Sequence, residues 1–135
     1  MKKSKNCYEP SKKITVLVVK PGEQPYLEDI IPDAPSLERI IEGIPEFFMP
    51  FKEFVAVFCD CEGKLSGKPL NRVFRDSDGH IFDVCAGTFI VVGMDNEDWE
   101  LISLSPDHIK KFSEQFKNPE RFICDNGKLT VVQIT

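Results

Sequence analysis

The segment Thr88–Val92 is a continuous run of β-branched and apolar residues that ends at Gly93. Such side chains favour β-strands, and a run without polar alternation indicates a strand that is covered on both faces. We therefore predict a central strand here, with other elements packed against each side of it.

Elsewhere, strand-like segments flank turn sequences. Two turns carry the strongest signals, Asp76-Ser77-Asp78-Gly79 and Asp125-Asn126-Gly127, because Gly and Asn adopt the positive φ angles that tight hairpins require. A weaker turn signal is Lys20-Pro21-Gly22. The predicted pairs are Ile14–Val19 with Tyr26–Ile31, Leu70–Arg75 with His80–Val84, and Arg121–Cys124 with Lys128–Ile134, and further strands are expected in Phe47–Phe51 and Phe54–Cys59.

Two helices are predicted from capping residues and apolar spacing. Ser36 can cap a short helix that ends near Gly43. A longer helix over about 105–117 begins with Ser105 and Pro106, and its apolar stripe is Ile109, Phe112 and Phe116. The fold class is therefore α+β, a mostly antiparallel sheet with hairpins and two helices, the longer one packed on the sheet.

The length suits one compact domain over residues 14–135, preceded by a flexible lysine-rich tail over residues 1–13. That tail holds five Lys and one Glu, while the remainder holds 12 basic and 21 acidic residues, which gives the body a net charge of about −9. Duplex nucleic acid is a poor partner for an acidic body, because affinity for it comes from distributed positive charge.

No apolar run approaches the roughly 20 residues of a membrane helix, and no signal-peptide segment follows the lysine-rich start. We expect a cytoplasmic protein with no membrane partner. Its five cysteines are odd in number and several lie in apolar runs, so they are interpreted as reduced thiols. Cys59 and Cys61 are too closely spaced for a usual zinc pair, and no second pair follows.

Arginine is scarce, with four residues in the chain, and two of them stand close together in the segment Pro69–Asp76. Arg72 and Arg75, with Asn71, could bind a phosphate or carboxylate, since guanidinium groups offer bidentate geometry. The simpler role is ion pairing with neighbouring carboxylates, for which Asp76, Asp78 and Asp83 are available. On a strand, Arg72 and Arg75 would point to opposite faces, whereas one helical turn would bring them together.

Arg121 could join the same pocket or anchor the last hairpin, and Thr88 could orient a bound ligand. No catalytic or metal-binding motif emerges from the pattern. Asp76–Gly79 lacks the third acidic ligand and the terminal Glu of a calcium loop, and the two histidines have no evident partner. We expect no cofactor and no enzymatic activity.

The sequence from Ile14 to the C-terminus resembles a family called domain of unknown function 3846, found in phages, mobile elements and Gram-positive bacteria. Four segments carry the resemblance. The chain departs from the family after the first helix, where members have a Gly-Gly-Tyr-like stretch and this chain has Gly43-Ile44-Pro45-Glu46. The matching segments are Val16–Gly22, Pro69–Asp76, Asp83 followed by Ala86–Phe89, and Pro119–Phe122. The resemblance implies a phage or mobile-element setting in a bacterial host and no specific activity.

The leading functional hypothesis is therefore a non-enzymatic accessory protein that binds and sequesters a small anionic ligand, such as a nucleotide-derived host-defence signal. Its ligand-binding residues would be Asn71, Arg72, Arg75, Thr88 and Arg121. A homo-oligomer would help to frame the pocket. Two alternatives stay open: an acidic protein-interaction module that inhibits a host protein, in the extreme as a nucleic-acid mimic, and a hydrolase of a nucleotide signal.

Overall fold

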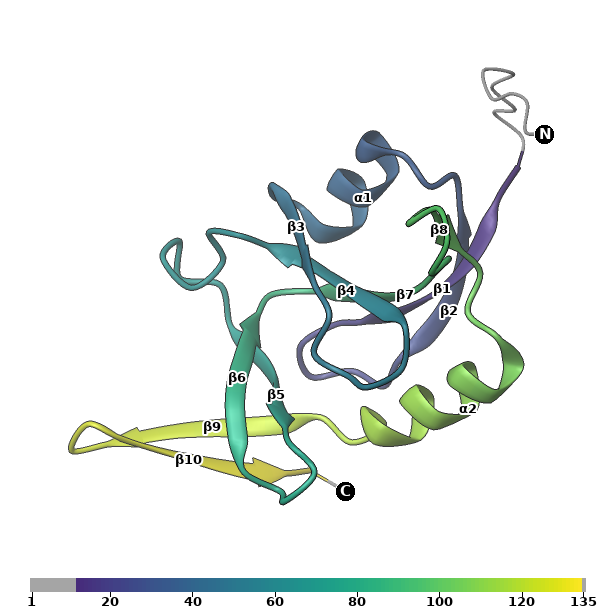
Figure 1. Cartoon of the computed structure of the whole chain (residues 1–135). Helices are drawn as coiled ribbons and strands as arrows, with labels where there is room; N and C mark the ends of the chain where they lie inside the picture. Colours follow the sequence, from purple (N-terminus) through teal and green to yellow (C-terminus); the bar gives the residue numbers. More distant parts are fainter. Residues whose placement is uncertain (1–11, 135) are drawn as a thin grey trace.

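Ten strands and two helices form within residues 12–134, the part of the chain that the computed structural model describes (Figure 1). Every strand pair is antiparallel, which confirms the predicted α+β fold. The strands are β1 (Ile14–Val19), β2 (Tyr26–Ile30), β3 (Pro45–Phe48), β4 (Val55–Asp60), β5 (Leu70–Arg75), β6 (Ile81–Ala86), β7 (Phe89–Met94), β8 (Leu101–Ile102), β9 (Glu120–Asp125) and β10 (Lys128–Gln133). The helices are α1 (Ala34–Ile41) and α2 (Pro106–Gln115).

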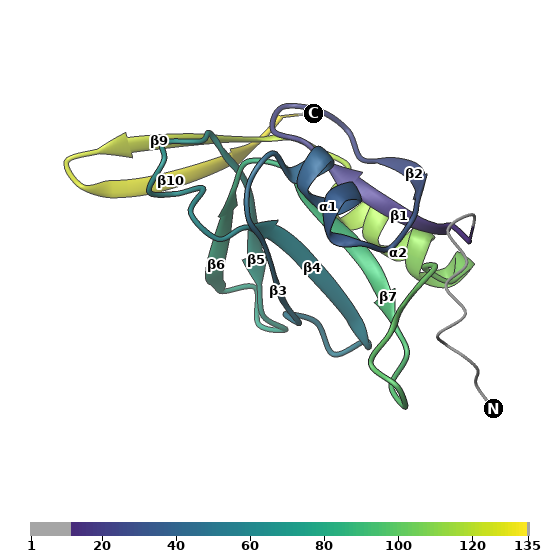
Figure 2. The ribbon, with the colours of Figure 1, turned by 90° about the horizontal axis from the view of Figure 1, so that it is seen from above.

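The main sheet has the order β2-β1-β7-β4-β3, and the two-residue strand β8 extends it beside β7. All six residues of β7 are buried, so the prediction of a central covered strand is confirmed. The two helices lie on opposite faces of this sheet (Figure 2). On one face Leu37, Ile40 and Ile41 of α1 pack on the sheet, and on the other Phe112 and Phe116 of α2 do so.

The N-terminus of α1 differs from the sequence prediction. Its cap is Asp33, not Ser36: the Asp33 carboxylate accepts a hydrogen bond from the Ser36 N–H at 3.0 Å, and the helix begins at Ala34. Asp caps a helix as well as Ser does, and the earlier start satisfies one more turn of backbone N–H groups. The α2 prediction is confirmed, since Ser105 accepts from the His108 N–H at 3.1 Å.

Two ribbons, β5–β6 and β9–β10, stand outside the main sheet. Their turns have the predicted chemistry: Gly79 has φ of 85°, and Asn126 and Gly127 have φ of 53° and 76°. Consecutive positive φ angles match the two-residue turn that suits the twist of a hairpin. The expected lysine-rich tail falls, up to residue 11, outside the described residues.

Neither helix in the described range has the length and apolar character that crossing a bilayer requires.

Phe112 tests the packing of α2. Its side chain is fully buried, and its ring lies 4.5 Å from the ring of Phe51, measured between centroids. Phe112→Ala should lower the free energy of unfolding by about 3–5 kcal/mol in urea denaturation. Phe82→Ala is the matched control, because that ring is half exposed, and it should cost about 1 kcal/mol or less. Equal losses would contradict the packing described.

Candidate functional site

Arg72 lies on β5 with 1% of its surface exposed. Its guanidinium donates twice to the Phe116 carbonyl, from Nε at 3.2 Å and Nη2 at 2.7 Å, and Nη2 also donates to the Glu23 carbonyl at 2.7 Å. Nη1 donates to the Asn71 side chain at 2.8 Å and its carbonyl at 3.5 Å. All five guanidinium donors are thus used inside the protein.

The contact with Phe116 places a positive charge at the C-terminus of α2, where the helix dipole is negative. Burial lowers the pKa of Arg72, while the negative charge of Glu120 acts in the opposite direction. An arginine side chain retains its proton even when buried. The guanidinium therefore joins β5 to the end of α2 and to the turn between β1 and β2.

Asn71 completes this arrangement. Its amide nitrogen donates to the carbonyls of Val19 at 2.9 Å and Gly87 at 2.8 Å, so it joins β5 to the end of β1 and to the turn before β7. Its amide oxygen accepts from Arg72, and no part of the side chain is exposed. Asn71 and Arg72 do lie together, as predicted. Their side-chain donors all bond to acceptors inside the protein, so none is available to a ligand.

The other three predicted residues lie apart. Arg75 is on the solvent side of β5, and its guanidinium is 4.0 Å from Glu120 and makes no ion pair with Asp76, Asp78 or Asp83. Arg121 is exposed on β9, and Thr88 is half buried between β6 and β7. The described residues therefore do not gather Asn71, Arg72, Arg75, Thr88 and Arg121 around one cavity.

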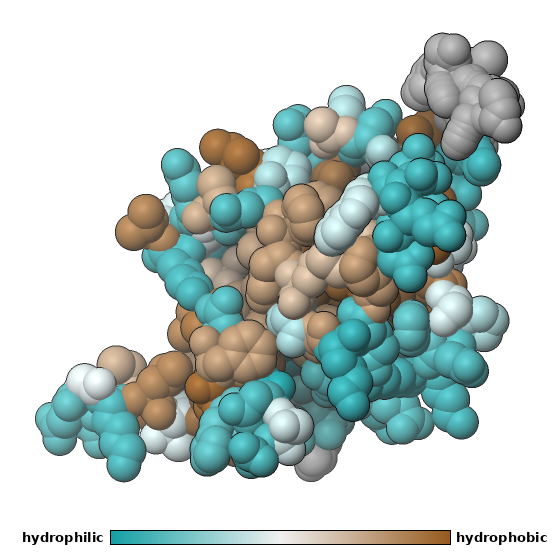
Figure 3. All heavy atoms as spheres, in the orientation of Figure 1, coloured by the Kyte–Doolittle hydropathy of each residue, from teal (hydrophilic) through white to brown (hydrophobic). Residues whose placement is uncertain are grey.

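Large apolar side chains are exposed on a different surface. Apolar residues gather over β3 and β4 on the face seen in Figure 3. The side chains of Phe47, Leu65, Ile81 and Phe82, which border this region on β3, β6 and the loop before β5, are each about half exposed or more. Contiguous apolar surface of this kind marks contact sites.

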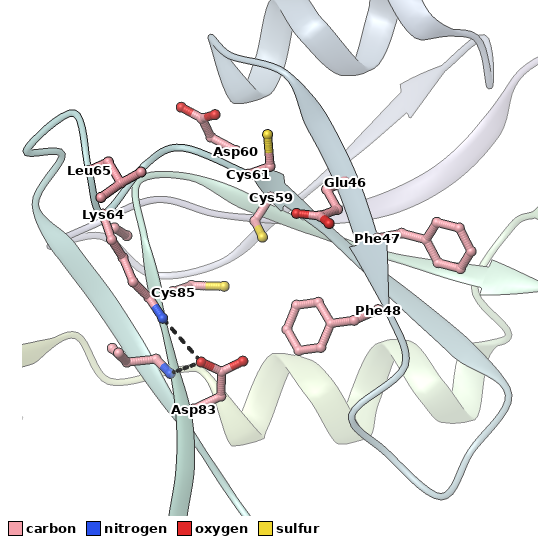
Figure 4. A pocket seen from close by; sticks show the side chains of 12 residues that line it. Glu46, Phe47, Phe48, Cys59, Asp60, Cys61, Lys64, Leu65, Asp83 and Cys85 are labelled. Atoms are coloured by element: carbon pink, nitrogen blue, oxygen red, sulfur yellow. Dashed lines mark hydrogen bonds and ion pairs between the residues drawn. The ribbon is translucent and has the colours of Figure 1, made fainter.

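A pocket of about 480 Å³ opens between β3, the end of β4, β6 and the loop after β4 (Figure 4). Its volume lies in the range of ligand sites. β3 and β6 form its opposing walls, and each is an edge strand, since β3 pairs only with β4 and β6 only with β5 in the described chain. The lining residues are Glu46, Phe47, Phe48, Cys59, Asp60, Cys61, Lys64, Leu65, Asp83, Val84, Cys85 and Ala86.

The floor of this pocket is the open end of the core beneath α2, where Phe48, Cys59 and Cys85 pack together. Three carboxylates surround the floor. Asp60 is paired with Lys68 at 2.8 Å, and Asp83 with Lys64 at 3.2 Å. Glu46 forms no ion pair within residues 12–134, so the pocket keeps a net negative charge.

Two of the paired groups have structural roles. Lys68 also donates to the carbonyls of Ile41 at 3.1 Å and Glu42 at 2.7 Å, so it closes the C-terminus of α1. The hydrogen bond from Lys68 holds the pKa of Asp60 below its usual value. Gly43 is required beside this pair, because a Cβ there would stand 2.3 Å from the Asp60 carboxyl carbon.

Three cysteines line the pocket as free thiols, as the sequence predicted. The sulfurs of Cys59 and Cys85 point toward one another (Figure 4). A hydrogen bond from Cys85 lowers the pKa of Cys59, and the same contact together with burial raises the pKa of Cys85. Partial desolvation and the charge of Glu46 raise the pKa of Cys61, and Glu46 opposes the lowering at Cys59.

Asp76, Asp78 and His80 are the one group in the described chain that brings three metal-ligand atoms within 4.8 Å of one another. All three are exposed at the β5–β6 turn, and one Asp76 oxygen already accepts the backbone N–H groups of Asp78 and His80 at 2.9 Å. These bonds are those of a side chain that stabilises a turn, which is how the sequence was interpreted.

A family model described as a domain of unknown function (DUF3846) matches residues 14–117, which end just before β9. No curated protein and no solved structure matches the chain. The pocket was not predicted from the sequence. The cysteines were interpreted only as reduced thiols, and the one available signal was that Glu46 directly precedes the strand-like segment Phe47–Phe51.

Substituting arginines separates a structural role from a surface role. Arg72→Leu leaves the Phe116 and Glu23 carbonyls without their donor and should lower the free energy of unfolding by about 3–5 kcal/mol. Arg75→Leu, on the same strand, should cost about 1 kcal/mol or less, because its long ion pair is partly exposed. Similar losses in chemical denaturation would show that Arg72 is not the anchor described.

The negative field of the pocket can be measured at its thiols. Alkylation rates followed against pH, with mass spectrometry to locate each product, should give a lower midpoint for Cys59 than for Cys61. Glu46→Gln should lower both midpoints, since the carboxylate disfavours both thiolates. Glu97→Gln, beyond the opposite end of β4, should change neither, and unmoved midpoints in Glu46→Gln would contradict the field.

Proposed function

The chain belongs to the family described as a domain of unknown function (DUF3846), and we propose that it is a non-enzymatic binding domain that captures an extended, basic segment of a partner protein. One observation carries this proposal: a negatively charged, apolar-floored pocket lies between two edge strands. Two features of the pocket, the edge strands that border it and its negative charge, favour the same kind of ligand.

The edges favour an extended segment. Edge strands present unpaired N–H and C=O groups, and an added strand satisfies them. Glu46–Phe48 of β3 and Asp83–Ala86 of β6 line the pocket as consecutive residues, so their backbone borders it as well as their side chains. A partner strand laid along either wall would place alternate side chains into the pocket.

The negative charge of the pocket favours arginine or lysine as the partner side chain that enters it. The aliphatic part of such a side chain would pack on Phe48 and the thiols, and its charged head would meet the unpaired carboxylate of Glu46. Arginine fits this environment better than lysine, because its planar group stacks on aromatic rings and forms bidentate contacts with carboxylates. The exposed side chains of Phe47, Leu65 and Phe82 would then be covered by the rest of the partner.

In a phage or mobile-element setting, the partner would be a host protein with a basic surface, and binding would inhibit it. Sequestration of a small anionic ligand has less support. Asn71 and Arg72 have no free donors, Arg75 faces a carboxylate, and the pocket has the wrong charge for an anion. Hydrolysis of a nucleotide signal has equally little support, because the anionic nucleotide would have to enter the same negatively charged pocket.

Peptide binding tests the proposal directly. A short, fluorescein-labelled peptide of β-branched residues with a central arginine should bind the protein, as followed by fluorescence anisotropy. The same peptide with a central glutamate should bind at least about tenfold more weakly, a difference of about 1.4 kcal/mol. Glu46→Gln should weaken the arginine peptide about fivefold, and raising the salt concentration should weaken it further.

Glu97→Gln is the matched control, because Glu97 is exposed in the loop between β7 and β8 and does not line the pocket. Binding of both peptides with equal affinity, or an unchanged affinity in Glu46→Gln, would refute the proposal. A nucleotide panel run in parallel by calorimetry would instead support anion sequestration if one member bound, and mass spectrometry of the recovered nucleotide would reveal turnover.

A further inference from the structure

The β9–β10 hairpin extends away from the rest of the protein, as Figures 1 and 2 both show. Within residues 12–134, its hydrogen bonds to the body are confined to its base, where the Glu120 carboxylate accepts the Val73 N–H at 2.9 Å. A two-stranded hairpin is marginally stable by itself in water. An extended ribbon of this kind therefore gains stability from any surface that covers it.

One face of the hairpin is fully open. Glu120, Phe122 and Val131 point to the inner face and are partly covered by the body. The opposite, outer face is defined by residues that all stand exposed: Arg121, Ile123, Asp125, Lys128, Thr130 and Val132. Ile123 and Val132 leave 45% and 47% of their surfaces in solvent. Ile123 pairs with Thr130 and Val132 with Arg121, so the two exposed β-branched residues are diagonal neighbours on one face, which indicates a contact surface.

The β9 part of the outer face has a self-complementary charge pattern, and Lys128 on β10 adds a second cation directly across from Asp125. Along β9 the pattern reads Arg121, Ile123, Asp125, a cation and an anion placed symmetrically about an apolar residue. Neither Arg121 nor Asp125 takes part in an ion pair inside residues 12–134. When two such faces meet with their strands reversed, each Arg121 stands over the other copy's Asp125, and the two Ile123 side chains meet on the axis.

The hairpin is also the part of this acidic chain where two copies repel least. Glu120–Gln133 contains two acidic and two basic residues, whereas the whole chain has a net charge of −5. A two-fold symmetric contact uses the same patch on both partners, and an alternation of opposite charges about a centre meets that condition. A different protein would need a complementary arrangement of charges to bind this face, whereas a second copy of the chain already has that arrangement.

We propose that the outer face of the β9–β10 hairpin binds the same face of a second copy of this chain, with Arg121–Asp125 ion pairs on either side of Ile123. Arg121 then has a role in assembly and not in a ligand pocket. The contact lies outside the pocket between β3 and β6, so its existence is independent of what that pocket holds. The face is small, and the dimer should have a micromolar dissociation constant.

Charge reversal provides a test with an internal control. In sedimentation velocity from about 5 to about 500 µM, the native chain should shift from monomer to dimer. Arg121→Asp and Asp125→Arg should each weaken the dimer at least about tenfold, because each places like charges together. The double variant, Arg121→Asp with Asp125→Arg, should restore it, since the reversed pattern is again self-complementary.

A second measurement locates the axis. Ile123→Cys combined with Cys124→Ser should form an intermolecular disulfide on mild oxidation, which mass spectrometry would identify as a link between the two residue-123 peptides. Native-like circular dichroism is expected for every variant, because the changed side chains are exposed. A native chain that stays monomeric throughout the range, or a double variant no better than the single ones, would overturn the proposal.

Discussion

The buried Arg72 guanidinium holds three parts of the protein in register. It donates to the carbonyl of Phe116, which caps the C-terminus of α2, and to that of Glu23. Asn71 beside it donates to the end of β1 and to the turn between β6 and β7. Burying a charge is unfavourable unless every donor is satisfied, and here the carbonyls of Phe116 and Glu23 together with Asn71 satisfy them. This arrangement fixes β5 against the main sheet, and β5 in turn positions β6, which is one wall of the pocket.

Because Arg72 and Arg75 are bonded within the protein, they also determine which ligands the surface can bind. Arg72 is internal and Arg75 is paired. Glu46, in contrast, lines the pocket above an apolar floor with two facing thiols and has no ion-pair partner within residues 12–134. A pocket of this charge attracts cations, and the edge strands beside it favour an extended backbone. The exposed Arg121 lies on the hairpin instead, where its symmetrical partner across Ile123 is Asp125.

Elements set by local sequence were predictable. The apolar run that became β7, the Ser105–Pro106 start of α2 and the Asn126–Gly127 turn each follow from side-chain preferences within a few residues. The N-cap of α1 is Asp33 and not the predicted Ser36, and the sequence alone could not choose between them because Asp and Ser cap helices equally well. Strand β8 has only two residues, too few to give a recognisable sequence pattern. The site was harder to predict, because it depends on contacts such as Arg72 to Phe116, separated by 44 positions, and on strands that become neighbours only after folding.

A single titration tests two claims together: that Arg72 is inaccessible to ligands, and that the pocket between β3 and β6 binds a peptide. In ¹H–¹⁵N correlation spectra, a peptide with a central arginine should shift the backbone signals of Glu46–Phe48 and Asp83–Ala86, which line the pocket. The Nε–H signal of Arg72 should stay in place and exchange slowly with solvent, because it is buried and bonded to Phe116. A peptide or nucleotide that moved the Arg72 signal and left β3 and β6 unchanged would contradict this account.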